Sequence, residues 1–150
     1  MIKRALAAIV YGGFVAGTLD IGVAALISWL SPAVILRAVA SGALGKAAFS
    51  DGASAAALGM TLQWAMSLII AAIYVIASAC IPSLSRRWIP ASLGYGVVVF
   101  FVVNYAVVPL SKAPFKTNST AQSFVLNLLA MLLFGLIIGF FTQRYAGRRG

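Results

Sequence analysis

The sequence of 150 residues contains no histidine, one cysteine and two acidic residues. Without histidine the chain lacks the commonest metal ligand and proton shuttle of proteins. The single cysteine, Cys80, excludes a disulfide within these residues and a metal site built from several thiolates. A Ser/His/Asp set, an HExxH motif, paired carboxylates and a phosphate-binding loop are also missing. We therefore expect no enzymatic activity, no cofactor and no metal site.

Charged residues of either sign are scarce, at 9% of the chain, whereas soluble domains have about 25%. Hydrophobic residues make up 63%, and the mean hydropathy is +1.05. This composition indicates an integral membrane protein. The apolar segments follow one another so closely that we expect residues 1–150 to form a single membrane domain.

Four apolar segments are long enough to cross a bilayer as helices, which takes about 20 residues each. They cover about residues 5–30, 53–80, 91–110 and 121–142. After the first, Ser31-Pro32 has the pattern of an N-cap and a first-turn proline, and it opens a segment too short to span, from 33 to about 44. The predicted fold is an all-α membrane protein, a bundle of four transmembrane helices with a short interfacial helix between helices 1 and 2.

The basic residues lie at the ends of the apolar segments, where such residues set orientation and contact anionic headgroups. The net charge of +9 therefore indicates a lipid bilayer as partner, and no nucleic acid. Four spans place both termini on one side. Most of the basic residues are predicted on that side: Lys3, Arg4, Arg86, Arg87, Arg144, Arg148 and Arg149. The opposite side would carry Arg37, Lys46, Lys112 and Lys116. This bias predicts cytoplasmic termini, and Arg86, Arg87 and Trp88 are the expected headgroup contacts.

One polar side chain falls in the outer half of each predicted span when depth is counted at about 1.5 Å per residue. The four are Asp20, Gln63, Asn104 and Asn127. In one interpretation the amides hydrogen-bond a neutral Asp20 and hold the bundle together. In the other, Asp20 is a proton or cation site, since intramembrane acids often mark such paths. We favour the first, because no Lys or Arg lies at a matching depth to pair with a charged Asp20.

Glycines give the first span a flat side on which another helix can pack closely. Gly13 and Gly17 are four residues apart, and Gly22 is nearby. Small residues at this spacing are typical of close helix contacts in membranes. We therefore expect helix 1 to pack inside a bundle through these glycines.

A resemblance to a known group rests on Gly17–Asp20 and on the segments 40–49, 57–64 and 95–111. There the chain resembles short bacterial inner-membrane proteins that are described only as uncharacterised. The resemblance covers most of the chain as far as residue 114 and implies a bacterial inner membrane and four spans, without an activity. A histidine is frequent in that group where this chain has Gln63, which weakens a proton relay and leaves amide hydrogen bonding intact.

The sequence favours a small structural or accessory subunit, in a homo-oligomer or attached to a larger membrane complex. The reasons are the small-residue helix face, the missing catalytic residues and a chain too short to enclose a wide pore alone. The alternative is an oligomeric proton-coupled transporter or channel that uses Asp20, and an enzyme acting on lipids comes third. Small multidrug exporters also have four short helices and an acid in the first, but this chain lacks their glutamate-centred first helix and has a longer outer loop.

Overall fold

The computed structural model describes residues 2–50, 52–112 and 121–147. Within these ranges the chain is helical and forms no strand, so the all-α class predicted from the sequence is confirmed. The elements are α1 (Ile2–Ser28), α2 (Pro32–Leu44), the 3₁₀ helix η1 (Gly45–Phe49), α3 (Ala53–Cys80), α4 (Pro82–Arg86), α5 (Trp88–Val102), the π-helix η2 (Val103–Val107), α6 (Val108–Leu110) and α7 (Ala121–Tyr145).

Five helical stretches among the described residues are long and apolar enough to cross a membrane. They are Ile2–Ser28, Pro32–Phe49, Ala53–Cys80, Trp88–Leu110 and Ala121–Tyr145. The sequence prediction counted four of these and treated the second as interfacial. The counts differ because η1 follows α2 directly and the two together reach 18 residues, whereas the sequence pattern placed the end of this helix near residue 44.

The helix ends agree with local sequence signals. Ser31 caps α2, with its hydroxyl accepting a hydrogen bond from the Val34 amide, and Pro32 is the first helical residue. The expected start of the third span, near residue 91, lies three residues inside the helix, because α5 begins at Trp88. Pro90 is tolerated there, since an amide in the first turn of a helix has no intrahelical partner to lose.

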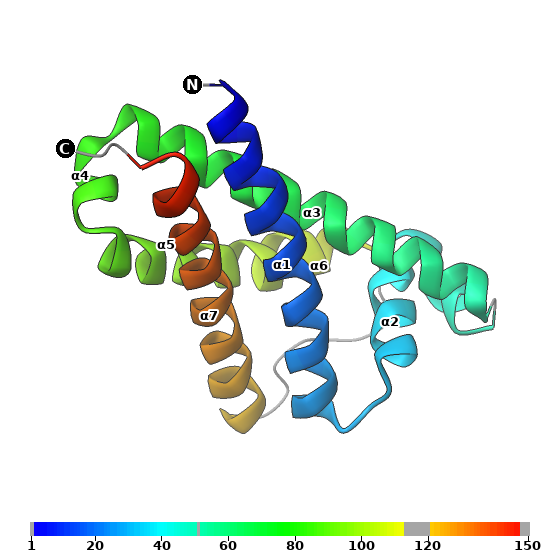
Figure 1. Cartoon of the computed structure of the whole chain (residues 1–150). Helices are drawn as coiled ribbons and strands as arrows, with labels where there is room; N and C mark the ends of the chain where they lie inside the picture. Colours follow the sequence, from blue (N-terminus) through cyan, green and yellow to red (C-terminus); the bar gives the residue numbers. More distant parts are fainter. Residues whose placement is uncertain (1, 51, 113–120, 148–150) are drawn as a thin grey trace.

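Figure 1 shows α1 and α7 running side by side in opposite directions, with α3 and α5 crossing them. The helix α1 packs on α3 and α7, α5 packs on α7, and α2 packs on α3. The start of α1, the end of α7 and α4 lie toward one end of the molecule, and α2 lies toward the other (Figure 1). Thus α7 lies between α1 and α5 and contacts both of them.

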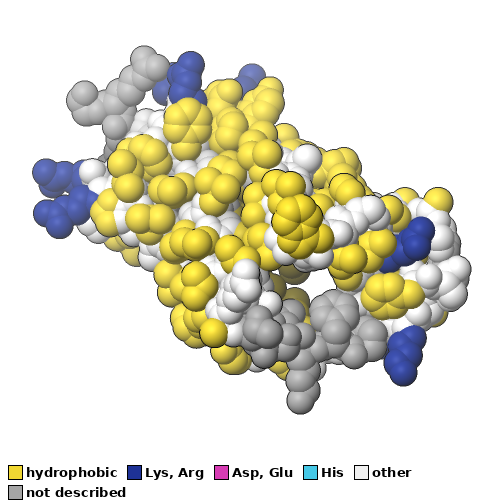
Figure 2. Space-filling model, turned by 90° about the horizontal axis from the view of Figure 1, so that it is seen from below, with side chains coloured by type: hydrophobic (Ala, Val, Ile, Leu, Met, Phe, Trp, Pro, Cys, Tyr) yellow, Lys and Arg dark blue, Asp and Glu magenta, His cyan; other side chains and the backbone are white. Residues whose placement is uncertain are grey.

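The molecular surface is largely hydrophobic. Figure 2 shows a broad hydrophobic face with Lys and Arg side chains toward the ends of the molecule. On the outer side of α3, Ile69, Ile73 and Ile76 are each more than half exposed, at 61%, 54% and 61%. An extended apolar surface between charged ends is what a lipid-facing protein presents.

A close helix contact joins α5 to α7 through small residues on both helices. A Cβ added at Gly96 would lie 2.5 Å from the Met131 carbonyl oxygen and 3.0 Å from Leu132 Cα. On α7, a Cβ at Gly135 would meet the backbone of α5, and one at Gly139 would overlap the side chain of Ser92. The two helix backbones can approach this closely only because these positions lack a side chain.

Two tyrosines join α3 to α5 beside that contact. The Tyr74 hydroxyl lies 3.0 Å from the Ser92 hydroxyl, and the Tyr95 hydroxyl donates to the Ile70 carbonyl at 2.6 Å. Their rings lie 5.0 Å apart between centroids. Tyr74 and Ser92 are fully buried, so these bonds satisfy polar groups in the core.

Candidate functional site

The contact between α1 and α3 is built on two glycines that the sequence singled out. A Cβ at Gly13 would lie 2.7 Å from Leu68 Cδ2 and 3.0 Å from Leu68 Cα. A Cβ at Gly17 would lie 3.0 Å from both Cβ and Oγ of Ser67. Both glycines therefore lie directly against the backbone and short side chains of α3.

Three side chains of α3 donate hydrogen bonds to α1 along this contact. Ser67 Oγ donates to the Gly13 carbonyl at 2.6 Å, and Trp64 Nε1 donates to Thr18 Oγ1 at 3.1 Å. Gln63 Nε2 donates to Asp20 Oδ2 at 2.9 Å. We call these three donors and their acceptors the α1–α3 polar contact. Trp64 and Ser67 were not among the residues predicted to make polar contacts. Their spacing from Gln63 along α3 nevertheless places all three near one face of the helix.

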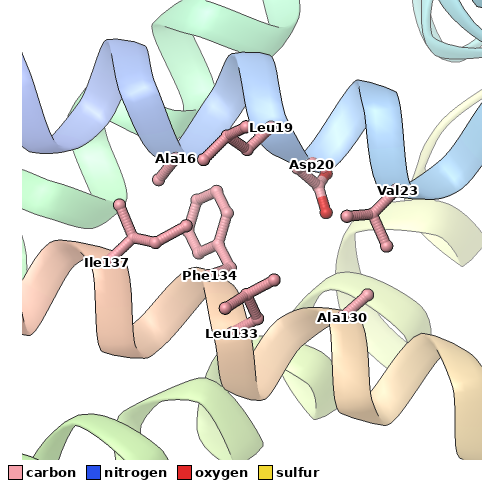
Figure 3. Close-up of a pocket in the computed structure, with 8 residues that line it drawn as sticks. All are labelled: Ala16, Leu19, Asp20, Val23, Ala130, Leu133, Phe134 and Ile137. Carbon is pink, nitrogen blue, oxygen red and sulfur yellow. The ribbon is translucent and has the colours of Figure 1, made fainter.

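The carboxyl group of Asp20 lies where α1 faces both α3 and α7. Figure 3 shows it between the two helices α1 and α7, surrounded by apolar side chains. It borders a cavity of about 10 Å³, which is also lined by Ala16, Leu19, Val23, Ala130, Leu133, Phe134 and Ile137. This volume is at the lower limit for one water molecule. The site can therefore hold a proton or a single water, and it has no room for a larger solute.

The structure brings Gln63 to Asp20 but gives Asn104 a partner on its own helix. Asn104 is buried in η2, and its Nδ2 donates to the Phe100 carbonyl at 2.8 Å. Pro109 lacks an amide hydrogen, which removes one helical bond nearby and favours the wider π turn. The Asn104 side chain thus supplies a donor to the backbone of α5 at the start of that turn.

Asn127 lies half-buried in the first half of α7. It is three residues before Ala130, which lines the Asp20 cavity, so the two share a side of the helix. Of the four predicted polar residues, Asp20 and Gln63 are in direct contact through a hydrogen bond. One hydrogen bond of Asn104 is made within its own helix, and the grouping of Asn104 and Asn127 with Asp20 stays a prediction.

Gly22 differs from the other two predicted packing glycines. A Cβ placed there would meet no atom of the described residues within 4 Å, so Gly22 makes no close helix contact with that part of the chain. Gly12, which the sequence analysis passed over, does make one: its Cβ would lie 3.3 Å from Phe141 Cβ on α7. Gly135 and Gly139 were not predicted as packing residues, although their four-residue spacing is the same signal that identified Gly13 and Gly17.

The three predicted headgroup contacts have different surroundings. Arg86 and Arg87 are exposed, at the end of α4 and just before α5. Trp88 is half-buried: its ring lies beside Gly139 of α7, 3.5 Å from where a Cβ would be. The Trp88 ring therefore packs α5 against α7.

No set of three or more His, Cys, Asp and Glu side chains that could hold a metal ion occurs within residues 2–50, 52–112 and 121–147. The structure thus offers hydrogen-bonding and packing groups at this site. No protein-family model, curated protein or solved structure matches the chain in sequence or fold comparisons.

Proposed function

We propose that this protein is a small integral membrane protein of the bacterial inner membrane and serves as a structural or accessory subunit, without enzymatic activity. Its partners are further copies of itself or the subunits of a larger membrane complex, together with anionic lipids. In this proposal four helices span the membrane, both termini are cytoplasmic and α2 lies along the outer interface.

The length of α2 supports four spans rather than five. Its 13 residues give about 20 Å of helix, less than the hydrocarbon thickness of about 30 Å. Gly45 ends it in a left-handed backbone conformation, with φ of +65°, so η1 does not continue it as one regular helix. The common location of the start of α1, the end of α7 and α4 also favours an even number of crossings (Figure 1).

The observation that carries the subunit proposal is the way Asp20 is engaged. Its carboxyl group accepts a hydrogen bond from Gln63, and the adjoining cavity of about 10 Å³ leaves no space for a solute. The one described carboxylate is thus used to join α1 to α3, as polar side chains do between membrane helices. A partly buried acid used in this way needs no transported ligand to explain it.

The transporter or channel alternative is favoured by one feature, the position of Asp20 beside that cavity (Figure 3). The cavity has room for about one water molecule, which could pass a proton to or from the carboxyl group. An oligomer would have to supply the rest of any path. This alternative predicts proton flux that depends on Asp20, which is tested below.

The subunit proposal is tested by gentle extraction of the tagged full chain in nanodiscs, followed by native mass spectrometry. We expect a discrete homo-oligomer or a second protein in fixed stoichiometry. As a control, an unrelated tagged four-helix membrane protein from the same membranes should not retain that second protein. A uniform population of single chains under these conditions would contradict the proposal.

A further inference from the structure

Basic residues of α7 and α4 lie on adjoining segments. Gln143 Nε2, in the last turns of α7, donates to the Ser85 carbonyl of α4 at 2.7 Å. Arg144 directly follows Gln143, and Arg86 directly follows Ser85. The hydrogen bond therefore brings together the two backbone segments that carry these exposed arginines.

Aromatic side chains fix the last turn of α7 against α1 at the same end. The Tyr145 ring stacks on Tyr11 of α1 with 5.4 Å between centroids, and on Phe141 with 6.2 Å. The Arg144 guanidinium carbon lies 6.0 Å from the Tyr145 ring centroid. Arg144 is thus held beside the junction of α1 and α7, close to aromatic rings of the kind found at membrane interfaces.

An apolar groove runs along α7 up to this end. Leu136, Ile137, Phe140 and Phe141 line it from α7, and Val15 of α1 and Trp88 of α5 line it from the neighbouring helices. Its volume is about 320 Å³, within the usual range of ligand sites. The groove also opens onto the surface of the molecule, so an occupant can enter from the side.

The groove and the basic residues are continuous. Phe140 and Arg144 are four residues apart on α7 and therefore share one face of the helix. Trp88, which lines the groove, directly follows Arg87. A ligand lying in the groove with its polar end toward the end of α7 would therefore approach the segments that carry Arg144, Arg86 and Arg87.

We infer that this groove binds one acyl chain of an anionic glycerophospholipid, whose phosphate is held by Arg144, Arg86 and Arg87. Guanidinium groups bind phosphate oxygens in a bidentate manner. Asp20 is the one carboxylate side chain among the described residues, and it is bound to Gln63, so no described acid neutralises these arginines. A headgroup with a net negative charge can neutralise the arginines. The acyl chain of the same lipid can occupy the apolar groove.

The test uses the full chain in detergent, with phosphatidylglycerol and phosphatidylcholine of identical acyl chains as probes, and counts bound lipids by native mass spectrometry. We expect selective binding of phosphatidylglycerol. Each of Arg144→Gln, Arg86→Gln and Arg87→Gln should weaken that binding about fivefold, the usual contribution of one basic residue near an anionic lipid surface.

Lys46→Gln is the matched control, because Lys46 is an exposed cation in η1 at the opposite end of the molecule. It should leave the binding unchanged. The substituted side chains are exposed, and an unchanged elution profile would verify that each variant folds. An equal loss in Lys46→Gln, or equal binding of phosphatidylcholine, would overturn the inference.

Glycerol phosphate tests whether binding needs the groove or only the arginines, because it carries the anionic group without an acyl chain. It should not displace phosphatidylglycerol when present at the same concentration. Displacement at equal concentration would mean that the arginines bind phosphate without help from the groove, and the acyl-chain site would be abandoned.

Discussion

Gln63 of α3 and Asp20 of α1, which are 43 positions apart in the chain, are joined by a hydrogen bond of 2.9 Å. The bond forms close to the point where Ser67 of α3 packs against Gly17 of α1. This close approach is possible because Gly17 has no side chain. A leucine at position 17 would push the helices apart and take Gln63 out of reach of Asp20. The small-residue face and the polar pair are therefore two parts of one contact.

Replacing Asp20 tests how much this bond contributes to stability. Asp20→Asn keeps a side-chain oxygen that can accept from Gln63, so the free energy of unfolding should change little. Asp20→Leu leaves the Gln63 amide without this acceptor. It should lower the free energy of unfolding by about 1–2 kcal/mol, the upper range for hydrogen bonds between membrane helices. Denaturation in mixed micelles measures both, and equal stability of the two variants would show that the bond is dispensable.

Proton flux in proteoliposomes separates the subunit proposal from the transporter alternative. If Asp20 carries protons, the wild type should dissipate a pH gradient and folded Asp20→Asn should not, because an amide cannot release a proton. We expect no flux above empty liposomes in either protein. Flux in the wild type that disappears in Asp20→Asn would refute a purely structural role.

The glycines of α1 provide a matched pair for testing the packing against α3. Gly17→Leu places a large side chain against Ser67 and should destabilise the fold by about 1–3 kcal/mol, as overpacking does. Gly22→Leu makes the same change on the same helix, where no atom lies within 4 Å of the new Cβ. Thermal unfolding in detergent should show a large loss for the first and little or none for the second.

A second pair tests the contact between α5 and α7. Gly96→Ala brings a methyl group to within 2.5 Å of the Met131 carbonyl oxygen, and backbone atoms cannot move aside cheaply. We expect a loss of about 1–3 kcal/mol. Gly94→Ala, two residues earlier, has nothing within 4 Å and should be neutral or gain up to about 1 kcal/mol from helix propensity. Similar melting temperatures for the two variants would contradict this packing.

Cysteine labelling in intact cells tests the orientation. Cys80 is exposed and is first replaced by serine, and single cysteines are then placed at Ser50 and Ser83, both exposed. With cytoplasmic termini, an impermeant maleimide should label position 50 and not position 83 until the cells are opened. The reverse pattern would place the termini outside.

Apolar length and helix-end signals were sufficient to place the helices, and α3 has the predicted bounds of 53–80. Depth along each helix also pointed to Gln63 as a partner of Asp20. Depth alone gives neither the direction a side chain faces nor the helix it meets, so the grouping of Asn104 and Asn127 with Asp20 stays a prediction. The sequence does not reveal that α5 packs on α7, or that the Asn104 side chain in η2 donates to the Phe100 carbonyl of α5.

The placement of α7 between α1 and α5 bears on how the protein is made. Chains emerge from the ribosome N-terminus first, so α7 is made after α1, α3 and α5. Until it arrives, Gly12 of α1 and Gly96 of α5 have no close partner, since their contacts are with Phe141 and with Met131 and Leu132 of α7. We therefore expect the contacts of α1 and α5 with α7 to form only after α7 has been made, later than the packing of α1 on α3.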